Sequence, residues 1–334
     1  MKWEEVRVFI TGIDGFVGSH IARALFSKGS HISGLLHKPI EKGKSRLLVW
    51  KIADIARNYI GDVTDKDCLE SILVESNPQW IVHLAAQTIV AYGQANAYDT
   101  LETNIKGTYN ILDIAAKLPE VRGIIVASSD KAYGSSLELP YTEEMPLRGG
   151  SIYDSSKACA DLVTWSLAKR FDLPLCITRC ANIYGPGDLH FSRIVPDTIQ
   201  SVINGNAPVI RGSGKHERDF IYIDDVISGY LKLADYLNQH HVSGEAFNFG
   251  TGNAVRILDL VQMIINLSYS KIKASVILRQ DNPAEIMKQC IDATKAQTLL
   301  RWTPHVSLPD GLKCTIDWYR TYFASEEVNE TSVR

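Results

Sequence analysis

Several features that would point to a membrane or an extracellular protein are missing from this sequence. No apolar run approaches the roughly 18 residues that a membrane-spanning helix needs, and the first residues contain no secretory apolar core. The six cysteines are scattered, and no two of them form a Cys-x-x-Cys pair. We therefore expect a reduced, cytoplasmic protein without a structural metal site.

An excess of one charge is missing as well. Lys and Arg total 35, Asp and Glu total 38, and the two signs are interspersed. This balance excludes an obvious surface for nucleic acid or for a membrane. What is present is an ordinary globular composition of 334 residues, 45% hydrophobic and 22% charged, a length that suits one large domain or two unequal ones.

The first apolar stretch is organised as a strand, a glycine turn and a helix. Residues 6–10 are β-branched and apolar, which is typical of a buried strand, and Gly12, Gly15 and Gly18 follow at three-residue spacing before apolar residues recur at helical spacing. Such a turn directs free backbone N–H groups and the positive end of a helix at a phosphate. The spacing differs from the common G-x-G-x-x-G fingerprint, and an ordinary βα turn is the alternative interpretation.

Strand and helix patterns alternate through the first half of the chain. We expect strands at 31–36, 59–63, 80–86, 123–128 and 175–179, and helices at 97–118 and 152–171. This alternation predicts an α/β fold with a Rossmann-like, doubly wound parallel sheet. After residue 179 the pattern becomes shorter and more broken, which indicates a smaller C-terminal α/β lobe. The predicted division is a dinucleotide-binding domain at 1–178 plus about 218–250, a substrate lobe at about 179–217 and 251–325, and a frayed tail at 326–334.

Two groups of polar residues in this frame are candidates for chemistry. Tyr153 and Lys157 are four residues apart, so on a helix they share one face. A phenol with its reference pKa near 10 is a poor base at neutral pH, and a neighbouring ammonium lowers that pKa. Ser129, Asp130 and Lys131 follow the strand at 123–128, at the sheet edge where ligands bind in doubly wound folds. The alternatives are a surface helix with a salt-bridging lysine and an ordinary β-turn.

The end of the second predicted strand leaves the choice of cofactor open. An acidic residue at this point grips the ribose hydroxyls in NAD-type sites, but here the strand runs into His37 and Lys38. A basic pair suits a 2′-phosphate. A solvated basic loop at 38–46 is an equally acceptable interpretation.

Taken together, these segments resemble the extended short-chain dehydrogenase/reductase family, whose members are NAD(P)-dependent epimerases and dehydratases of nucleotide sugars. The likeness covers nearly the whole chain, in the order of the family. It is carried by Thr11–Gly18, Gly61–Val63, His83–Ala86, Asn104, Ser128–Ser129, Tyr153 with Lys157, Asn182 and Arg218–Tyr222.

The resemblance implies a role for each matching position. It implies bound NAD, with NADP not excluded, held by Gly12, Gly15, Phe16, Val17, Gly18, His37, Asp62, Val63, Leu84, Ala85, Ala86, Tyr153 and Lys157. It implies a catalytic group of Ser129, Asp130, Lys131, Tyr153 and Lys157, with Tyr153 as the base. It implies a nucleotide-sugar site formed by Gln87, Ser129, Asn182, Arg193, Ile194, Val195, Val209, Arg211 and Arg218. It also implies a homodimer through the helices at 97–118 and 152–171, and no metal.

Within that family, the residues after Ser129 separate the possible reactions. A 4,6-dehydratase needs a proton donor for the 6-hydroxyl, which Asp130 fits, whereas a 4-epimerase does not. Lys131 matches the pattern of CDP-glucose 4,6-dehydratases. The sequence departs from the family at 282–288, where an expected arginine is missing and Lys288 is the available phosphate contact.

We therefore expect a dehydratase that converts a nucleotide hexose such as CDP-glucose into a 4-keto-6-deoxy sugar nucleotide through transient oxidation at carbon 4. The alternative is a 4-epimerase of the UDP-glucose or UDP-glucuronate type that uses the same Tyr153 and Lys157. A cofactor-binding regulator without chemistry is the non-enzymatic alternative.

Overall fold

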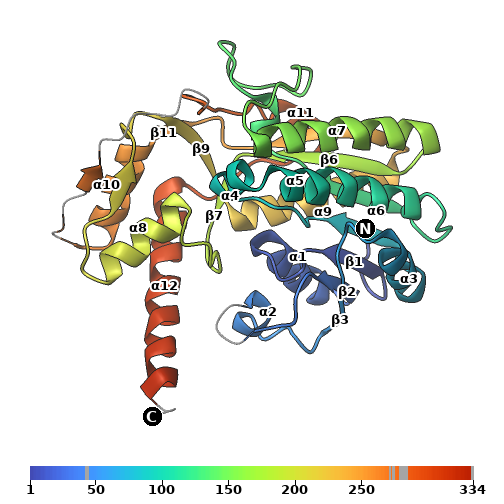
Figure 1. The fold of residues 1–334 in the computed structure, drawn as a ribbon, viewed down its shortest axis with the longest axis horizontal. Helices are drawn as coiled ribbons and strands as arrows, with labels where there is room; N and C mark the ends of the chain where they lie inside the picture. The colour runs from blue at the N-terminus through green and yellow to red at the C-terminus, as the bar shows by residue number, and fades with distance from the viewer. Residues whose placement is uncertain (42–44, 271, 273–274, 278–284, 332–334) are drawn as a thin grey trace.

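The structure is a computed structural model that describes residues 1–41, 45–270, 272, 275–277 and 285–331; the side chains of residues 211, 275–277 and 326–331 lie outside it. Its larger part is a seven-stranded sheet with helices on both faces (Figure 1). The strand order is β10-β6-β5-β4-β1-β2-β3, and all neighbours pair in parallel. This arrangement confirms the predicted Rossmann-like fold. The strands are β1 (Arg7–Thr11), β2 (His31–Leu36), β3 (Ala56–Ile60), β4 (Trp80–His83), β5 (Gly123–Ala127), β6 (Leu175–Cys180) and β10 (Ser243–Phe249).

Alternate residues of β1 face opposite sides of the sheet, as the strand period requires. Val8 and Ile10 pack into one hydrophobic cluster, whereas Phe9 packs into a second cluster on the other face. The first cluster includes α1 (Phe16–Phe26) and α9 (Ile223–Gln239), and the second includes α3 (Lys66–Ser76), α6 (Gly107–Ala115) and α7 (Ile152–Phe171). The sheet is therefore buried on both faces, and ligands can reach it only at its edges.

A smaller part is built mainly from segments that follow β6. It contains a three-stranded sheet in the order β11-β9-β7 and a two-stranded sheet of β12 and β8. Its elements are β7 (Asn182–Tyr184), α8 (Ile194–Ile203), β8 (Val209–Arg211), β9 (Glu217–Tyr222), β11 (Ala254–Arg256), α10 (Ile257–Leu267), β12 (Ser275–Ile277) and α12 (Leu308–Thr331). The helix α11 (Thr294–Leu300) packs instead against α9 and β10 of the larger part. The pairing places β10 in the large sheet and β9 in the small one, while the predicted domain boundaries stay a prediction.

Two predicted strands end earlier than expected. The third, expected at 59–63, is Ala56–Ile60, because the chain turns at Asp62. The carboxylate of Asp62 accepts hydrogen bonds from the backbone N–H and the hydroxyl of the residue two positions on, each at 2.8 Å. The fourth, expected at 80–86, ends at His83. The loops after both strands therefore lie at the carboxyl edge of the sheet.

The predicted helix at 97–118 consists of three pieces. They are α5 (Ala97–Leu101), a π-helical segment at Glu102–Lys106, and α6. Asn104, in the π-helical segment, accepts a hydrogen bond from the backbone N–H of Gln87 at 2.7 Å and donates one to its carbonyl at 3.0 Å. The irregular turn thus holds the loop that follows β4, and such turns frequently occur at functional sites.

Other helical features also differ from the expectation. The short helices α2 (Arg46–Val49) and α4 (Val90–Ala95) were not expected, and α12 continues to Thr331, past the predicted start of a frayed tail. Among the described helices, none has the length and apolar character that a transmembrane span requires.

Candidate functional site

The glycine turn between β1 and α1 leaves no room for side chains. Gly12 has φ +67°, and a Cβ atom on Gly18 would lie 2.2 Å from the carbonyl oxygen of Gly12. Gly15 donates to that same carbonyl oxygen at 2.8 Å and begins α1 without a side-chain cap among the described residues. The first N–H groups of α1 are therefore available to a phosphate, as the sequence predicts.

A buried chain of hydrogen bonds fixes the loop beside this turn. The hydroxyl oxygen of Thr11 accepts the N–H groups of Leu84 and Ala85, each at 3.0 Å, and lies 2.8 Å from Nδ1 of His83. Nε2 of His83 lies 3.1 Å from the hydroxyl of Thr108, which in turn donates to a backbone carbonyl. Burial lowers the pKa of His83 to about 3, so the imidazole is neutral.

Only one proton arrangement satisfies this chain. The Thr108 hydroxyl donates its proton to the carbonyl, so towards His83 it can only accept, and Nε2 of His83 must carry the proton. Nδ1 of His83 is then unprotonated and accepts a hydrogen bond from the Thr11 hydroxyl. The sequence resemblance included Thr11 and His83 but gave them no task. Their task is to tie the carboxyl ends of β1 and β4 together, which keeps the wall of the glycine turn in place.

The remaining residues predicted for the cofactor are near the same sheet edge, although not all expose their side chains. Nδ1 of His37 lies 3.5 Å from Oδ2 of Asp62. The side chains of Phe16 and Val63 are buried in the two hydrophobic clusters. These two residues can therefore offer a ligand little beyond their backbone groups.

The predicted base and its lysine are both buried at the start of α7. A capping box of Ser151 and Asp154 fixes this helix start. Nζ of Lys157 donates to the carbonyl of Ala127, at the end of β5, at 2.9 Å, and burial lowers its pKa to about 8. Burial also raises the pKa of Tyr153 to about 12, against a hydrogen bond with Ser129.

This direction corrects the expectation drawn from the sequence. We expected Lys157 to lower the pKa of Tyr153, but burial is the larger effect, and the charge that opposes it comes from Arg193. The ammonium of Lys157 is occupied by the carbonyl at the end of β5. A phenol in this environment stays protonated until a further positive charge arrives.

The turn after β5 holds a carboxyl group in an unusual state. Ser129 caps a short 3₁₀ turn, and its hydroxyl donates to Oδ1 of Asp130 at 3.1 Å. Asp130 is 2% exposed, and its Oδ2 has no hydrogen-bond partner among the described residues. Burial raises the pKa of Asp130, while the charges of Lys131 and Arg218 partly oppose that rise. A buried carboxyl of this kind is suited to donate a proton.

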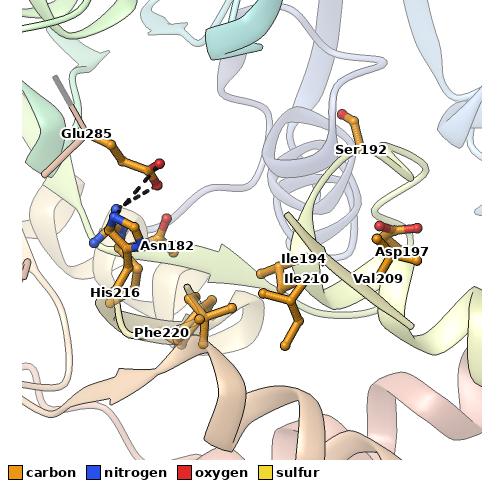
Figure 2. A pocket seen from close by; sticks show the side chains of 12 residues that line it. Asn182, Ser192, Ile194, Asp197, Val209, Ile210, His216, Phe220 and Glu285 are labelled. Carbon is orange, nitrogen blue, oxygen red and sulfur yellow. Dashed lines mark hydrogen bonds and ion pairs between the residues drawn. The ribbon is translucent and has the colours of Figure 1, made fainter. Parts of the chain in front are cut away.

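A pocket of about 300 Å³ lies in the smaller part of the molecule (Figure 2). Its residues come from four segments that are far apart in the sequence: Asn182, Ser192, Ile194, Asp197, Val209, Ile210, Gly214, His216, Arg218, Phe220, Ile257 and Glu285. The figure shows His216 and Glu285 at one end and Ser192 and Asp197 at the other, with Ile194 and Ile210 between them. The charge of Arg218 acts on Asp130, so the end of the pocket with Arg218 faces the turn after β5 that holds Asp130.

Glu285 occupies the cationic end of this pocket. Nη2 of the buried Arg218 lies 3.2 Å from Oε1 of Glu285, and Nε2 of the buried His216 lies 3.9 Å from Oε2. Half of the Glu285 side chain is exposed, whereas each of its partners is 8% exposed. A carboxylate of the protein thus holds the place where a larger anion could bind.

Some residues predicted for the substrate lie elsewhere. Val195 packs in the hydrophobic core instead of lining the pocket. Arg193 pairs with Asp188 at 3.0 Å and donates to Thr88 at 3.1 Å, and its charge acts on Tyr153, so it lies near the start of α7. The side chain of Gln87 accepts a hydrogen bond within its own loop at 2.5 Å. The side chain of Arg211 lies outside the described residues.

Besides Ile210, which lies between the predicted Val209 and Arg211, the sequence reasoning assigned no substrate role to these pocket residues: Ser192, Asp197, Gly214, His216, Phe220, Ile257 and Glu285. A signal for two of them was available. His216, Arg218 and Phe220 alternate along β9 and the residue before it, and strand residues two apart face the same side. The predicted role of Arg218 could therefore have been extended to His216 and Phe220.

The chain resembles known proteins along nearly its whole length. The family model described as GDP-mannose 4,6 dehydratase matches residues 9–315. The chain is 27% identical to the CDP-glucose 4,6-dehydratase of Salmonella typhimurium, over 98% of this chain and 94% of that protein.

The fold resembles solved structures of enzymes with two different activities. The dTDP-glucose 4,6-dehydratase DesIV of Streptomyces venezuelae, solved with NAD bound, has a TM-score of 0.85 and 28% identity over 95% of this chain and 97% of its own. The UDP-glucose 4-epimerase of Thermotoga maritima, solved with UDP-glucose, has a TM-score of 0.86 and 26% identity over 95% and 99%. The fold is thus shared by proteins whose reactions differ.

Proposed function

The chain belongs to the GDP-mannose 4,6-dehydratase family, and from that premise we propose that this NAD-dependent nucleotide-sugar enzyme is a 4,6-dehydratase acting on a nucleotide hexose such as CDP-glucose. One observation carries the choice of reaction. Asp130 is buried, lacks a partner for Oδ2 among the described residues and has a raised pKa, beside Tyr153 and Ser129. A dehydratase needs such an acid, whereas a 4-epimerase does not.

The residues present fit NAD. Gly12 and Gly18 let the turn pack closely on its own backbone and on Ala85, and the N-terminus of α1 starts there without a side-chain cap among the described residues, as close approach of a pyrophosphate requires. Bound there, NAD would accept a hydride from carbon 4 of the sugar and return it to carbon 6. Asp62 is our candidate for the adenine, and Lys157 for the nicotinamide ribose.

Three side chains carry the proton transfers, and Ser129 orients the 4-hydroxyl. Tyr153 would ionise beside the positive charge of a bound nicotinamide, losing its own proton to solvent, and would then take the proton of the 4-hydroxyl. The resulting ketone makes the carbon-5 hydrogen acidic. Lys131 is the base for that hydrogen: burial lowers the pKa of its ammonium, which releases a proton to solvent before it takes the carbon-5 proton. Lys131 returns this proton to carbon 5 when carbon 6 receives the hydride. Asp130 donates its proton to the departing 6-hydroxyl, which leaves as water.

The pocket suits the nucleotide part of the substrate. Arg218 and Asn182 are our candidates for the diphosphate, at the end of the pocket that faces Asp130. The apolar middle, with Ile194 and Val209, suits a nucleobase. CDP is our first choice because Lys131 follows the CDP-glucose pattern and a CDP-glucose 4,6-dehydratase is among the similar proteins.

A panel of CDP-, dTDP-, UDP- and GDP-hexoses tests this function. We expect a keto product with alkaline ultraviolet absorbance from the CDP-hexose. Asp130→Asn should lower the rate of dehydration by about 10²- to 10⁴-fold, the range of general-acid catalysis, while oxidation at carbon 4 continues. Because the epimerase from Thermotoga maritima shares the fold, 4-epimerisation is the second candidate. An epimerised sugar without a keto product would establish it and overturn the dehydratase.

We also propose that the protein forms a homodimer through α5, α6 and α7, which lie side by side in Figure 1. Large side chains are exposed there, including Tyr98 on α5 and Leu162 and Trp165 three residues apart on α7. Trp165→Glu should convert the dimer to a monomer in sedimentation equilibrium. Leu137→Glu, at a fully exposed apolar residue in a loop, is the control. A monomeric parent protein would contradict the proposal.

A further inference from the structure

Lys131 does not pair with its neighbour Asp130, although the two side chains can carry opposite charges. Nζ of Lys131 donates instead to Oε1 of Gln289, at 3.0 Å. Of the two carboxyl oxygens of Asp130, Oδ1 accepts from Ser129 and Oδ2 has no partner among the described residues. The lysine therefore donates its hydrogen bond to Gln289 and not to the carboxyl group next to it, although its charge still acts on that carboxyl group.

Gln289 is held firmly where it meets Lys131. Its side chain is fully buried. On one side, its backbone N–H donates to the carbonyl of Glu217 at 3.0 Å, and on the other side the next residue, Cys290, accepts from the N–H of Tyr141 at 2.8 Å. Because this segment is hydrogen-bonded on both sides, the amide of Gln289 has little freedom to move.

The orientation of that amide follows from the chemistry of its partner. An ammonium group only donates hydrogen bonds, so the amide oxygen must face Lys131. The amide nitrogen of Gln289 then points away from it, and this buried nitrogen has no partner among the described residues. The segment thus places a buried polar side chain here although one of its two ends is left unsatisfied, which is unfavourable.

We propose that Gln289 is a positioning residue that draws the Lys131 ammonium away from Asp130, so that Asp130 keeps the proton it donates. The inference rests on the proposed dehydratase function, in which Asp130 is the acid. An ammonium beside a carboxyl group lowers the carboxyl pKa by about one to three units. Gln289 limits that effect by giving the ammonium a neutral acceptor.

Asp130 is faced by charged and titratable groups from every element packed around it. They are Tyr153 on α7, Cys180 on β6, Tyr141 in the loop between the 3₁₀ turn and α7, and Arg218 and Asp219 on β9. None of these is changed when Gln289 is substituted. A change in the titration of Asp130 after such a substitution therefore reports the position of Lys131.

Two substitutions at Gln289 give opposite expectations. In Gln289→Leu, Lys131 loses its acceptor and turns to Asp130, so the pKa of Asp130 should fall by about one unit or more. In Gln289→Glu, a carboxylate of nearly the same shape holds Lys131 more strongly and adds a negative charge, so the pKa of Asp130 should rise. The second variant keeps the experiment decisive if the leucine variant does not fold.

The protonated carboxyl band in the infrared spectrum measures this pKa without turnover. The band of Asp130 is assigned by its loss in Asp130→Asn. We expect its midpoint to move to lower pH in Gln289→Leu and to higher pH in Gln289→Glu. In a Lys131→Met background, Gln289→Leu should cause no further shift, because the charge through which Gln289 acts is gone.

Turnover provides a second measurement. Since dehydration needs protonated Asp130, its rate falls as pH rises through that pKa, and this alkaline limb should move in the same directions as the infrared midpoint. Equal midpoints in the parent and both variants, or a shift that persists in Lys131→Met, would overturn the role of Gln289. Absence of dehydration on every nucleotide sugar would instead overturn the proposed function, and the infrared titration would still decide the role of Gln289.

Discussion

The glycine turn and the pocket, which form the two sides of the proposed site, are assembled differently. The wall of the turn comes from β1 and β4, adjacent parallel strands, and backbone groups and one buried hydrogen-bond chain shape it. The pocket takes residues from four segments of the chain, and their side chains determine its charge and polarity. In the turn, the N–H groups at the start of α1 have no side-chain cap among the described residues. In the pocket, Glu285 already holds Arg218.

This difference indicates two ways of binding an anion. The glycine turn is preorganised, because its donors are backbone groups that do not need to move. If the pocket binds the diphosphate as proposed, Arg218 exchanges the carboxylate of Glu285 for the ligand, and this exchange lowers the net gain from Arg218. We therefore expect the affinity for the dinucleotide to depend on packing, and the affinity for the nucleotide sugar to depend on charge.

Tyr153, which lies where the two sides meet, should give the largest effect. Tyr153→Phe removes the hydroxyl that bonds Ser129 but leaves the ring in its buried place. We expect turnover to fall by about 10²- to 10⁴-fold, the usual contribution of a general base. Calorimetric titration should show unchanged binding of NAD and of the nucleotide diphosphate. A variant that keeps the parent rate would mean that Tyr153 is not the base.

Gly18→Ala tests the preorganised side. The added methyl group would lie 2.2 Å from a backbone oxygen that cannot move without opening the turn. Overpacking of this kind costs about 1–3 kcal/mol, so NAD affinity should fall by about tenfold or more. Gly93→Ala is the matched control, since its methyl group would meet no atom closer than 3.5 Å. Equal NAD affinity in both variants would mean that packing of the turn does not govern binding.

The two sides also differ in how well the sequence predicts them. The glycine turn, Tyr153, Lys157 and the turn at Ser129 each follow a strand or begin a helix, and local patterns are enough to find such positions. The parallel sheet then brings them to one edge, because the carboxyl ends of all its strands lie there. The fold and this edge of the site were therefore predictable from local information.

The pocket was less predictable because its partners are distant in the sequence. The pairing of Arg218 with Glu285, and of Lys131 with Gln289, depends on how the segment at 285–291 lies along β9. The state of Tyr153 was also beyond the sequence, since burial by the whole fold outweighs a lysine one turn away. Local patterns carry no measure of such burial.

His83→Gln tests the preorganised side through the pH dependence of the free energy of unfolding. The pKa of His83 is about 3 in the folded protein, against about 6.5 when unfolded, so between these values the unfolded chain binds more protons and stability falls as pH falls. At pH 4.5, two units below 6.5, His83 should cost the parent about 2–3 kcal/mol. Denaturant unfolding should show that His83→Gln avoids this loss.

His20 provides the internal comparison for that experiment. Its pKa is lowered to about 4 by burial, so it destabilises the protein in the same pH window in both the parent and the variant. Only the difference between the two unfolding curves belongs to His83. Parallel curves from pH 6.5 to 4.5 would mean that the buried chain from Thr11 to Thr108 tolerates a charged imidazole.

Glu285→Gln should give the smallest effect and tests the pocket side most directly. Removing the carboxylate frees Arg218 and His216 for the diphosphate, so KM for the nucleotide sugar should fall while kcat stays the same. Because Glu285 is half exposed, solvent weakens its pairing, and we expect only about a two- to fivefold change, in line with partly exposed ion pairs. Added salt should narrow the difference between the variant and the parent.

Glu245→Gln is the matched control, because it removes the same charge from a pair with Lys295 that does not line the pocket. A similar fall in KM in both variants would assign the effect to overall charge instead of to competition at Arg218. A rise in KM in Glu285→Gln alone would mean that Glu285 contacts the substrate directly. In that case both sides of the site would be ready-made for their ligands, and the contrast between a preorganised turn and a pocket that exchanges its own carboxylate would no longer hold.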